Sequence, residues 1–204
     1  MLNPGSRQLG WAKRMLFGLA LLPLLRLLWL GMHDSLTANP IEFITRATGE
    51  WTLYFLCFTL AVTPLRRLTG LNGLLRLRRM LGLFTFFYAC LHFLTFLWFD
   101  HFFDLAAMMQ DVLKRPFIAM GFSAFVLLVP LAVTSSDRMI RKLGRRWTLL
   151  HRLIYLIAVL SLLHFWWMRA GKNNVAEPMV IGAIIAVLLA LRWVSLRRDT
   201  SRAR

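Results

Sequence analysis

The chain is a series of long apolar segments separated by short polar ones. Six of these segments approach the length of about 17–25 residues that a helix needs to cross the hydrocarbon core of a bilayer. The shortest begins beside Glu50, which we expect at the membrane interface. The pattern predicts an all-α integral membrane protein, a six-transmembrane-helix bundle with helices over residues 15–32, 49–64, 80–99, 117–134, 147–168 and 179–196.

The first apolar segment follows Arg7, Lys13 and Arg14, and in this it resembles a secretory signal peptide. Its core is long for a signal peptide, however, and no good small-residue cleavage site follows it. We therefore predict that 15–32 is a retained membrane helix.

The basic residues predict how the helices are oriented. The chain has 25 Lys and Arg residues against 9 Asp and Glu residues, a formal net charge of +16. With the N-terminus inside, most basic residues fall in inner segments, and positive residues accumulate on the cytoplasmic side of membrane proteins. Both termini are therefore predicted to be cytoplasmic. Because the charges lie between apolar segments, nucleic acid is not an expected partner. The basic residues predicted outside are Arg46, Lys114, Arg115, Arg169 and Lys172.

The polar segments are too short to contain a nucleotide-binding domain, and no glycine-rich phosphate motif occurs in them. No internal repeat is evident, so residues 1–204 are predicted to form a single domain. Cys57 and Cys90 both lie inside apolar segments. This position favours buried hydrophobic side chains over a disulfide or a thiolate metal site.

Three histidines lie within predicted membrane helices, where ionisable side chains usually face a protein interior, a partner or a cofactor. His92 is in 80–99, and His151 and His164 are near the two ends of 147–168. His33 and His101 fall in or beside outer loops, where we expect surface histidines.

His92 and His164 are expected at similar depth, because both of their helices run from inside to outside. His92 lies eight residues before Asp100 and His164 five before Arg169, a mismatch of about 4.5 Å along the helix axis. Two imidazoles facing each other between parallel helices suit the iron of a six-coordinate b-type haem. His151 is about 12 Å from His92 in depth, near the inner interface. Hydrogen-bonded core histidines and a proton relay remain alternatives.

Cationic side chains are available for the propionates of such a haem. The candidates are Arg78, Arg79, Arg152 and Arg26, the last of which we expect to be buried. The basic loop 66–79 could also hold a flavin or quinone headgroup or a lipid phosphate, although a topology signal is its ordinary explanation.

Several motifs in combination resemble a known family over nearly the whole chain. The motifs are Arg78-Arg-Met-Leu-Gly82, Tyr88-Ala-Cys-Leu-His92, Arg115-Pro-Phe117, Pro130-Leu-Ala-Val-Thr-Ser135, Arg146-Trp147, His151-Arg-Leu-Ile-Tyr155 and His164. The family is that of the haem-binding membrane subunits of bacterial protein-methionine-sulfoxide reductase systems. More distantly, the chain is similar to the transmembrane domains of ferric reductases and NADPH oxidases, in which two helices each carry two haem-ligating histidines.

The resemblance implies a subunit of the bacterial inner membrane with one or two b-type haems and FMN. It implies that electrons come from the quinone pool or a cytosolic flavin reductase. They would pass to a periplasmic molybdopterin enzyme that reduces methionine sulfoxide in proteins, so the substrate is reduced on the partner subunit. By this resemblance His92 and His164 correspond to the outer histidine pair, and His151 to the inner histidine of its helix. Arg78 stands where the oxidases have a fourth histidine.

Two other functions remain open. A membrane module of a metal-ion reductase or oxidase would work with another partner. A haem-free transporter or proton channel would use His92, His151 and His164 as a relay, but no pair of broken helices at matching positions supports it. In a redox function the chain needs an external electron donor, because it has no nucleotide site of its own.

Overall fold

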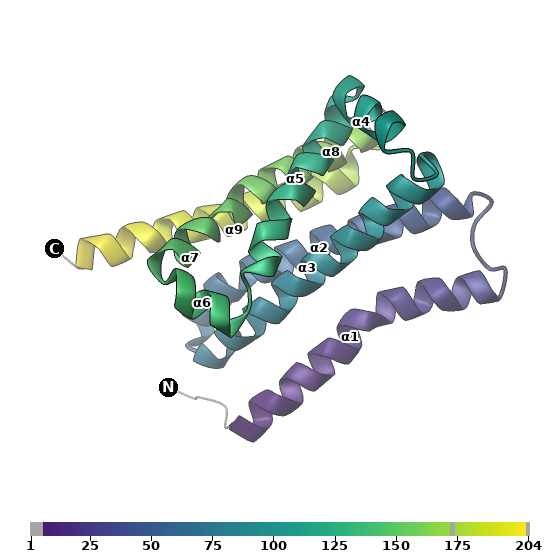
Figure 1. Cartoon of the computed structure of the whole chain (residues 1–204). Helices are drawn as coiled ribbons and strands as arrows, with labels where there is room; N and C mark the ends of the chain where they lie inside the picture. The colour runs from purple at the N-terminus through teal and green to yellow at the C-terminus, as the bar shows by residue number, and fades with distance from the viewer. Residues whose placement is uncertain (1–5, 172–173, 203–204) are drawn as a thin grey trace. The chain divides into compact units, whose positions relative to one another are not determined.

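The computed structural model describes residues 6–171 and 174–202. Every regular element in these residues is a helix (Figure 1), which confirms the predicted all-α class. Lys172 and Arg204, which contribute to the predicted orientation, lie outside the described residues. The structure divides into two compact units, Met1–Leu105 and Ala106–Arg204.

Six long helices account for most of the described residues. They are α1 (Ser6–Met32), α2 (Pro40–Thr69), α3 (Leu75–Thr95), α5 (Pro116–Val133), α8 (Leu153–Ala170) and α9 (Ala176–Arg202). Shorter elements lie between them. These are the 3₁₀ helix η1 (Asn72–Leu74), the π-helix η2 (Phe96–Asp100), α4 (Leu105–Lys114), α6 (Asp137–Leu143) and α7 (Arg145–Leu150). The sequence did not predict α4 or α6.

Five helical stretches in the described part of the chain are long and apolar enough to cross a membrane. They are Arg7–Met32, Asn72–Asp100, Pro116–Val133, Arg145–Ala170 and Ala176–Val194. α2 is not among them, although its 30 residues span about 45 Å. Charged residues near both ends, from Glu42 to Glu50 and at Arg66 and Arg67, leave α2 only a short apolar middle. The sixth span and the cytoplasmic termini remain predictions.

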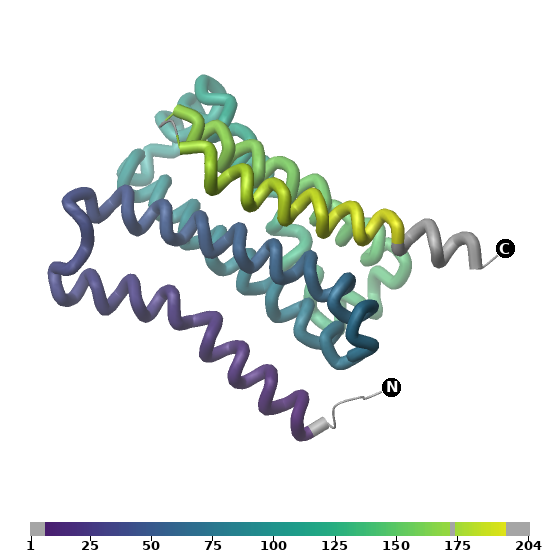
Figure 2. Tube along the Cα trace, turned by 180° about the vertical axis from the view of Figure 1, so that it is seen from behind, coloured from purple at the N-terminus to yellow at the C-terminus, as the bar shows by residue number. Residues whose placement is uncertain are grey.

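α2 and α3 form an antiparallel hairpin in the first unit (Figures 1 and 2). The side chain of Asn39 caps α2 by accepting from the backbone N–H of Glu42 at 3.1 Å. Pro40 follows in the first turn, where a missing N–H costs least. Gly70 ends the helix with φ of 72°, a left-handed conformation that favours glycine. The short connection places α3 beside α2.

The core of this unit is aromatic. The ring of Phe55 on α2 stacks on those of Tyr88 and Phe84 on α3, with centroids 5.3 and 5.5 Å apart. Tyr88 is completely buried, and its hydroxyl donates to the backbone carbonyl of Ala20 on α1 at 2.7 Å. This hydrogen bond ties α1 to the hairpin.

α1 buries only part of its surface. Ala20 and Leu27 are buried, whereas Leu25 and Leu28 are exposed. Arg26 lies with the exposed residues. The prediction that Arg26 is buried was therefore wrong, because α1 contacts its unit along one face.

In the second unit, α5 packs against α8, and α9 packs along α8. Pro116 opens α5, as expected for a proline at the start of a helix. The indole N–H of Trp147 donates to the carbonyl of Thr134 at 2.9 Å and so links α7 to the end of α5. Arg192 on α9 donates to the hydroxyl of Tyr155 on α8 at 3.2 Å. This bond gives the buried guanidinium of Arg192 a partner inside the unit.

The predicted helix 147–168 is interrupted in the structure. α7 ends at Leu150, and α8 begins at Leu153. Between them, the N–H of Arg152 bonds to the carbonyl of Leu149, and the N–H of Tyr155 bonds to that of Arg152. These three-residue steps are typical of a tight 3₁₀ turn. The sequence predicted that His151 and His164 lie on one regular helix. The structure shows that they do not, because the turn between α7 and α8 interrupts it.

Candidate functional site

His92 lies on α3, and its Nδ1 donates to the backbone carbonyl of Thr45 on α2 at 2.9 Å. The two residues are 47 positions apart in the sequence, and the hairpin brings them together. Gly49 lies one helical turn after Thr45. A Cβ atom on Gly49 would lie 3.0 Å from Cε1 and 3.2 Å from Nδ1 of His92. The imidazole therefore lies directly against the backbone of α2.

His164 lies on α8 in the same kind of environment. Its Nδ1 donates to the backbone carbonyl of Phe117 on α5 at 2.7 Å, again across 47 positions. Gly121 lies one turn after Phe117, and a Cβ atom there would lie 2.8 Å from Nδ1 and 2.9 Å from Cε1 of His164. The ring of Phe117 stacks near the imidazole at a centroid distance of 6.2 Å.

The two environments form an internal repeat that the sequence analysis missed. Adding 72 to the numbers of Thr45, Gly49 and His92 gives those of Phe117, Gly121 and His164. When 72 is added to the residue numbers, the range of α2 overlaps that of α5, and the range of α3 overlaps those of α7 and α8. The spacing was present in the sequence, but a threonine and a phenylalanine at equivalent positions gave no reason to align them. The two residues contribute only their backbone carbonyls to the hydrogen bonds with the histidines, so their side chains need not be alike.

Helix geometry explains why each carbonyl is followed by a glycine. In an α-helix the carbonyl of residue i points toward residue i+4, whose side chain normally covers that side of it. Glycine has no Cβ atom, so an imidazole from the neighbouring helix can approach the carbonyl of Thr45 or Phe117 from the side. In each unit the carbonyl therefore accepts the hydrogen bond of the ring, and the glycine leaves the space that the ring occupies.

The hydrogen bonds also define the tautomer of each histidine. A carbonyl only accepts, so Nδ1 of His92 and of His164 carries the proton. In a neutral imidazole the lone pair is then on Nε2. Metal-ligating histidines usually donate their other ring N–H to a carbonyl or carboxylate, which fixes the ring and raises its basicity. Both histidines have this arrangement.

His151 lies in a different environment. Its Nδ1 bonds to the carbonyl of Trp147, four residues earlier, at 3.1 Å, and its ring stacks on the indole at 3.9 Å. These contacts are local to α7 and the turn after it, and they involve no second long helix.

The two remaining histidines were predicted at the surface. His33 is exposed, as predicted. His101 is half-buried, with its ring against that of Phe96 at 4.6 Å.

Three of the four arginines predicted for a propionate lie toward the opposite helix ends from the histidine of their own unit. Arg78, half-buried, and Arg79, exposed, precede His92 on α3 by about 20 Å along the axis. Arg152 is exposed in the turn before α8, about 18 Å before His164 if measured as helix. Within each unit, the structure therefore does not place these arginines at the level of the histidine.

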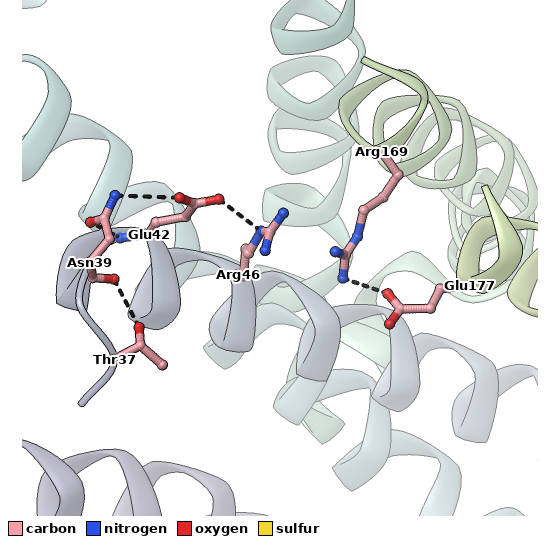
Figure 3. A network of polar contacts seen from close by, with 6 residues as sticks. All are labelled: Thr37, Asn39, Glu42, Arg46, Arg169 and Glu177. Carbon is pink, nitrogen blue, oxygen red and sulfur yellow. Dashed lines mark hydrogen bonds and ion pairs between the residues drawn. The ribbon is translucent and has the colours of Figure 1, made fainter. Parts of the chain in front are cut away.

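Each unit has another arginine near its histidine site. Figure 3 shows that each of these arginines pairs with a glutamate. In the first unit Arg46 follows Thr45, and its Nε lies 3.2 Å from Oε1 of Glu42. In the second unit Arg169 lies five residues after His164, and its Nη2 lies 2.5 Å from Oε2 of Glu177. Arg169 is buried. The sequence analysis placed Arg46 and Arg169 outside the membrane, because both lie just beyond the bounds of the predicted helices 49–64 and 147–168.

Within the described residues, no group of three or more His, Cys, Asp or Glu side chains could hold a metal ion. A bare zinc ion in a protein usually takes three or four protein ligands. An iron in a macrocycle needs only one or two axial ligands from the protein. The donor set therefore fits a haem better than a bare ion.

Comparison with known proteins gives consistent matches. A family model described as "Ferric reductase like transmembrane component" matches residues 47–162. A protein of Herminiimonas arsenicoxydans named "Protein-methionine-sulfoxide reductase heme-binding subunit MsrQ" is 61% identical, over 98% of this chain and 94% of that protein. Proteins of the same name from Bordetella parapertussis and Ralstonia nicotianae are 52% and 60% identical, over 98% and 86% of this chain and 97% and 82% of their own lengths. No solved structure matches the chain significantly.

Proposed function

Because this chain belongs to the ferric reductase-like transmembrane family, and within it to the MsrQ family, we propose that it is the haem-binding membrane subunit of a protein-methionine-sulfoxide reductase system. Membership in this family and the five apolar helices make it a membrane protein. The observation that carries the proposal is the pair of Nδ1–carbonyl hydrogen bonds at His92 and His164.

We propose that Nε2 of His92 and Nε2 of His164 are the axial ligands of one b-type haem. Each ring is held by a carbonyl on one side, in the tautomer that leaves Nε2 able to bind iron. Two neutral imidazole nitrogens are one of the axial ligand sets that complete a six-coordinate haem iron. When bound, the haem would accept and release single electrons, and the protein would supply its position and tune its potential.

The charged residues have separate roles in this proposal. Arg46 and Arg169 lie at the level of the proposed ligands and would bind the haem propionates, since guanidinium groups form strong hydrogen bonds with carboxylates. Arg78, Arg79 and Arg152 would serve a second group at the other ends of the helices. There they would bind an FMN or quinone headgroup, or the propionates of a second haem beside His151.

The proposed electron path runs across the bacterial inner membrane. The quinone pool or a cytosolic flavin reductase would donate electrons on the side of Arg79 and His151. The periplasmic molybdopterin enzyme MsrP would receive them on the side of His92 and His164, and would reduce methionine sulfoxide in oxidised proteins. In this arrangement 1–204 acts as one domain, α2 is the sixth span, and both termini are cytoplasmic.

Spectra of purified variants test the ligand assignment. We expect the wild-type protein to show the reduced-minus-oxidised spectrum of a low-spin b-type haem. His92→Ala and His164→Ala should each abolish it, because each removes one ligand of the same iron. His33→Ala is the matched control and should keep the full spectrum, since His33 is exposed. Wild-type haem content in either ligand variant would refute the pairing.

A further inference from the structure

We propose that Gly49 and Gly121 are positioning residues. Because they have no side chain, each lets the imidazole of a ligand histidine reach a helix carbonyl, and this hydrogen bond raises haem affinity and lowers the midpoint potential of the haem. The inference rests on the proposed function, because it requires His92 and His164 to be the ligands. It adds two residues and two backbone carbonyls, those of Thr45 and Phe117, to the site.

The first step is steric. An added Cβ on Gly121 would lie 2.8 Å from the ring of His164, a distance that real Cβ atoms essentially never show. On Gly49 it would lie 3.0 Å from the ring of His92, which is tighter than nine in ten Cβ contacts, so the ring would have to move. The nearest atoms belong to imidazole rings, which cannot bend away as the end of a flexible chain can. An alanine would therefore push the ring off its carbonyl or push the two helices apart.

The second step is electronic. The bond from Nδ1 to a carbonyl leaves more electron density on Nε2, which strengthens its bond to iron and favours the oxidised state. A displaced ring would lose this bond. Loss of such an outer partner typically weakens metal binding by about 10–100-fold.

The third step is selectivity. Other glycines in the long helices do not touch a histidine. An added Cβ on Gly82 of α3 would lie 3.8 Å from Cγ2 of Thr59, and one on Gly182 of α9 would lie 3.5 Å from Cδ1 of Leu162. Both are ordinary van der Waals contacts. Gly49 and Gly121 are the two whose added Cβ would contact a histidine ring. Each lies four residues after the carbonyl that accepts from that ring, and each unit contains one of them.

The experiment compares Gly49→Ala and Gly121→Ala with Gly82→Ala and Gly182→Ala in the full-length protein. Haem affinity, the midpoint potential and the electron paramagnetic resonance spectrum of the oxidised haem are measured. We expect the first two variants to bind haem about 10–100-fold more weakly, with a higher midpoint potential and altered resonance positions. The two controls should match the wild type.

A second measurement does not depend on a variant that folds. ¹⁵N NMR of histidine-labelled, haem-free protein reports which ring nitrogen carries the proton. We expect His92 and His164 to be protonated at Nδ1. Protonation at Nε2 in the haem-free protein would overturn the inference.

The outcomes also separate this inference from the proposed function. If His92→Ala and His164→Ala lose the haem but Gly49→Ala and Gly121→Ala behave like the controls, only the role of the glycines is wrong. If the histidine variants keep the haem, the proposed function itself is wrong.

Discussion

Replacing Tyr88 by phenylalanine isolates one hydrogen bond that ties α1 to the helix of His92. Tyr88 lies one turn before His92 on α3, and its hydroxyl donates to the carbonyl of Ala20 at 2.7 Å from a completely buried position. Phenylalanine keeps the ring and its stacking on Phe55. The carbonyl of Ala20 keeps its regular acceptor role within α1. The variant therefore removes the hydrogen bond without leaving the carbonyl unsatisfied.

The expected loss in the free energy of unfolding is about 0.6–1 kcal/mol. Hydrogen bonds between membrane helices average about 0.6 kcal/mol, and a typical net value in proteins is about 1 kcal/mol. Either value changes the unfolding equilibrium only about 3–5-fold. Tyr88→Leu also removes the ring and its stacking, so it should cost about 2 kcal/mol or more.

The assay is reversible unfolding in mixed micelles of increasing SDS content, followed by far-ultraviolet circular dichroism. The haem spectrum of Tyr88→Phe should remain that of the wild type, because the bond to Ala20 is not part of the ligand environment. A cost equal to that of Tyr88→Leu would refute the reasoning, since it would mean that the hydroxyl carries the whole contribution. So would a cost of zero.

Three further predictions concern the inner group, the propionates and the orientation. His151→Ala should keep the haem of His92 and His164 but slow its reduction by the inner donor, and rapid mixing measures this; an unchanged rate would return His151 to a structural role. Arg169→Gln should shift the midpoint potential of that haem in a redox titration, whereas Arg138→Gln, an exposed residue of α6, should not. Reporter fusions after Arg67 and Arg204 should be active only in the cytoplasm, and periplasmic activity at Arg204 would contradict six spans.

The sequence predicted the fold class and the candidate ligands because both depend on local composition. Long apolar segments require helices in a membrane, and histidines inside them are few enough to be noticed. Arg46 and Arg169 were assigned to loops by the same local reasoning. The structure places them on helices, each with a glutamate partner at one turn or across a connection.

The environment of the histidines could not be predicted in the same way. The acceptors of His92 and His164 are backbone carbonyls 47 positions away. Every residue has a backbone carbonyl, so the residue type does not show which one accepts a hydrogen bond from a histidine. The turn at His151 was also missed. Its sequence contains no proline or glycine from Arg145 to Ala170, so nothing in its composition breaks the helix.

The internal repeat also bears on a second haem. Shifting His151 back by 72 positions gives Arg79, and Trp147, on which the ring of His151 stacks, corresponds to Leu75. No glycine in the long helices as described has the ring of His151 beside its Cβ position, and Nδ1 of His151 bonds within its own turn. Each unit thus has the same carbonyl-and-glycine arrangement around one histidine. The units differ at the other end of the helices, where the second unit has the imidazole of His151 and the first has the guanidinium of Arg79. An arginine does not ligate iron but does bind phosphates and carboxylates. If the proposed function is correct, we therefore expect one bis-histidine haem per chain and an anionic group such as FMN, in place of a second haem, at the second level.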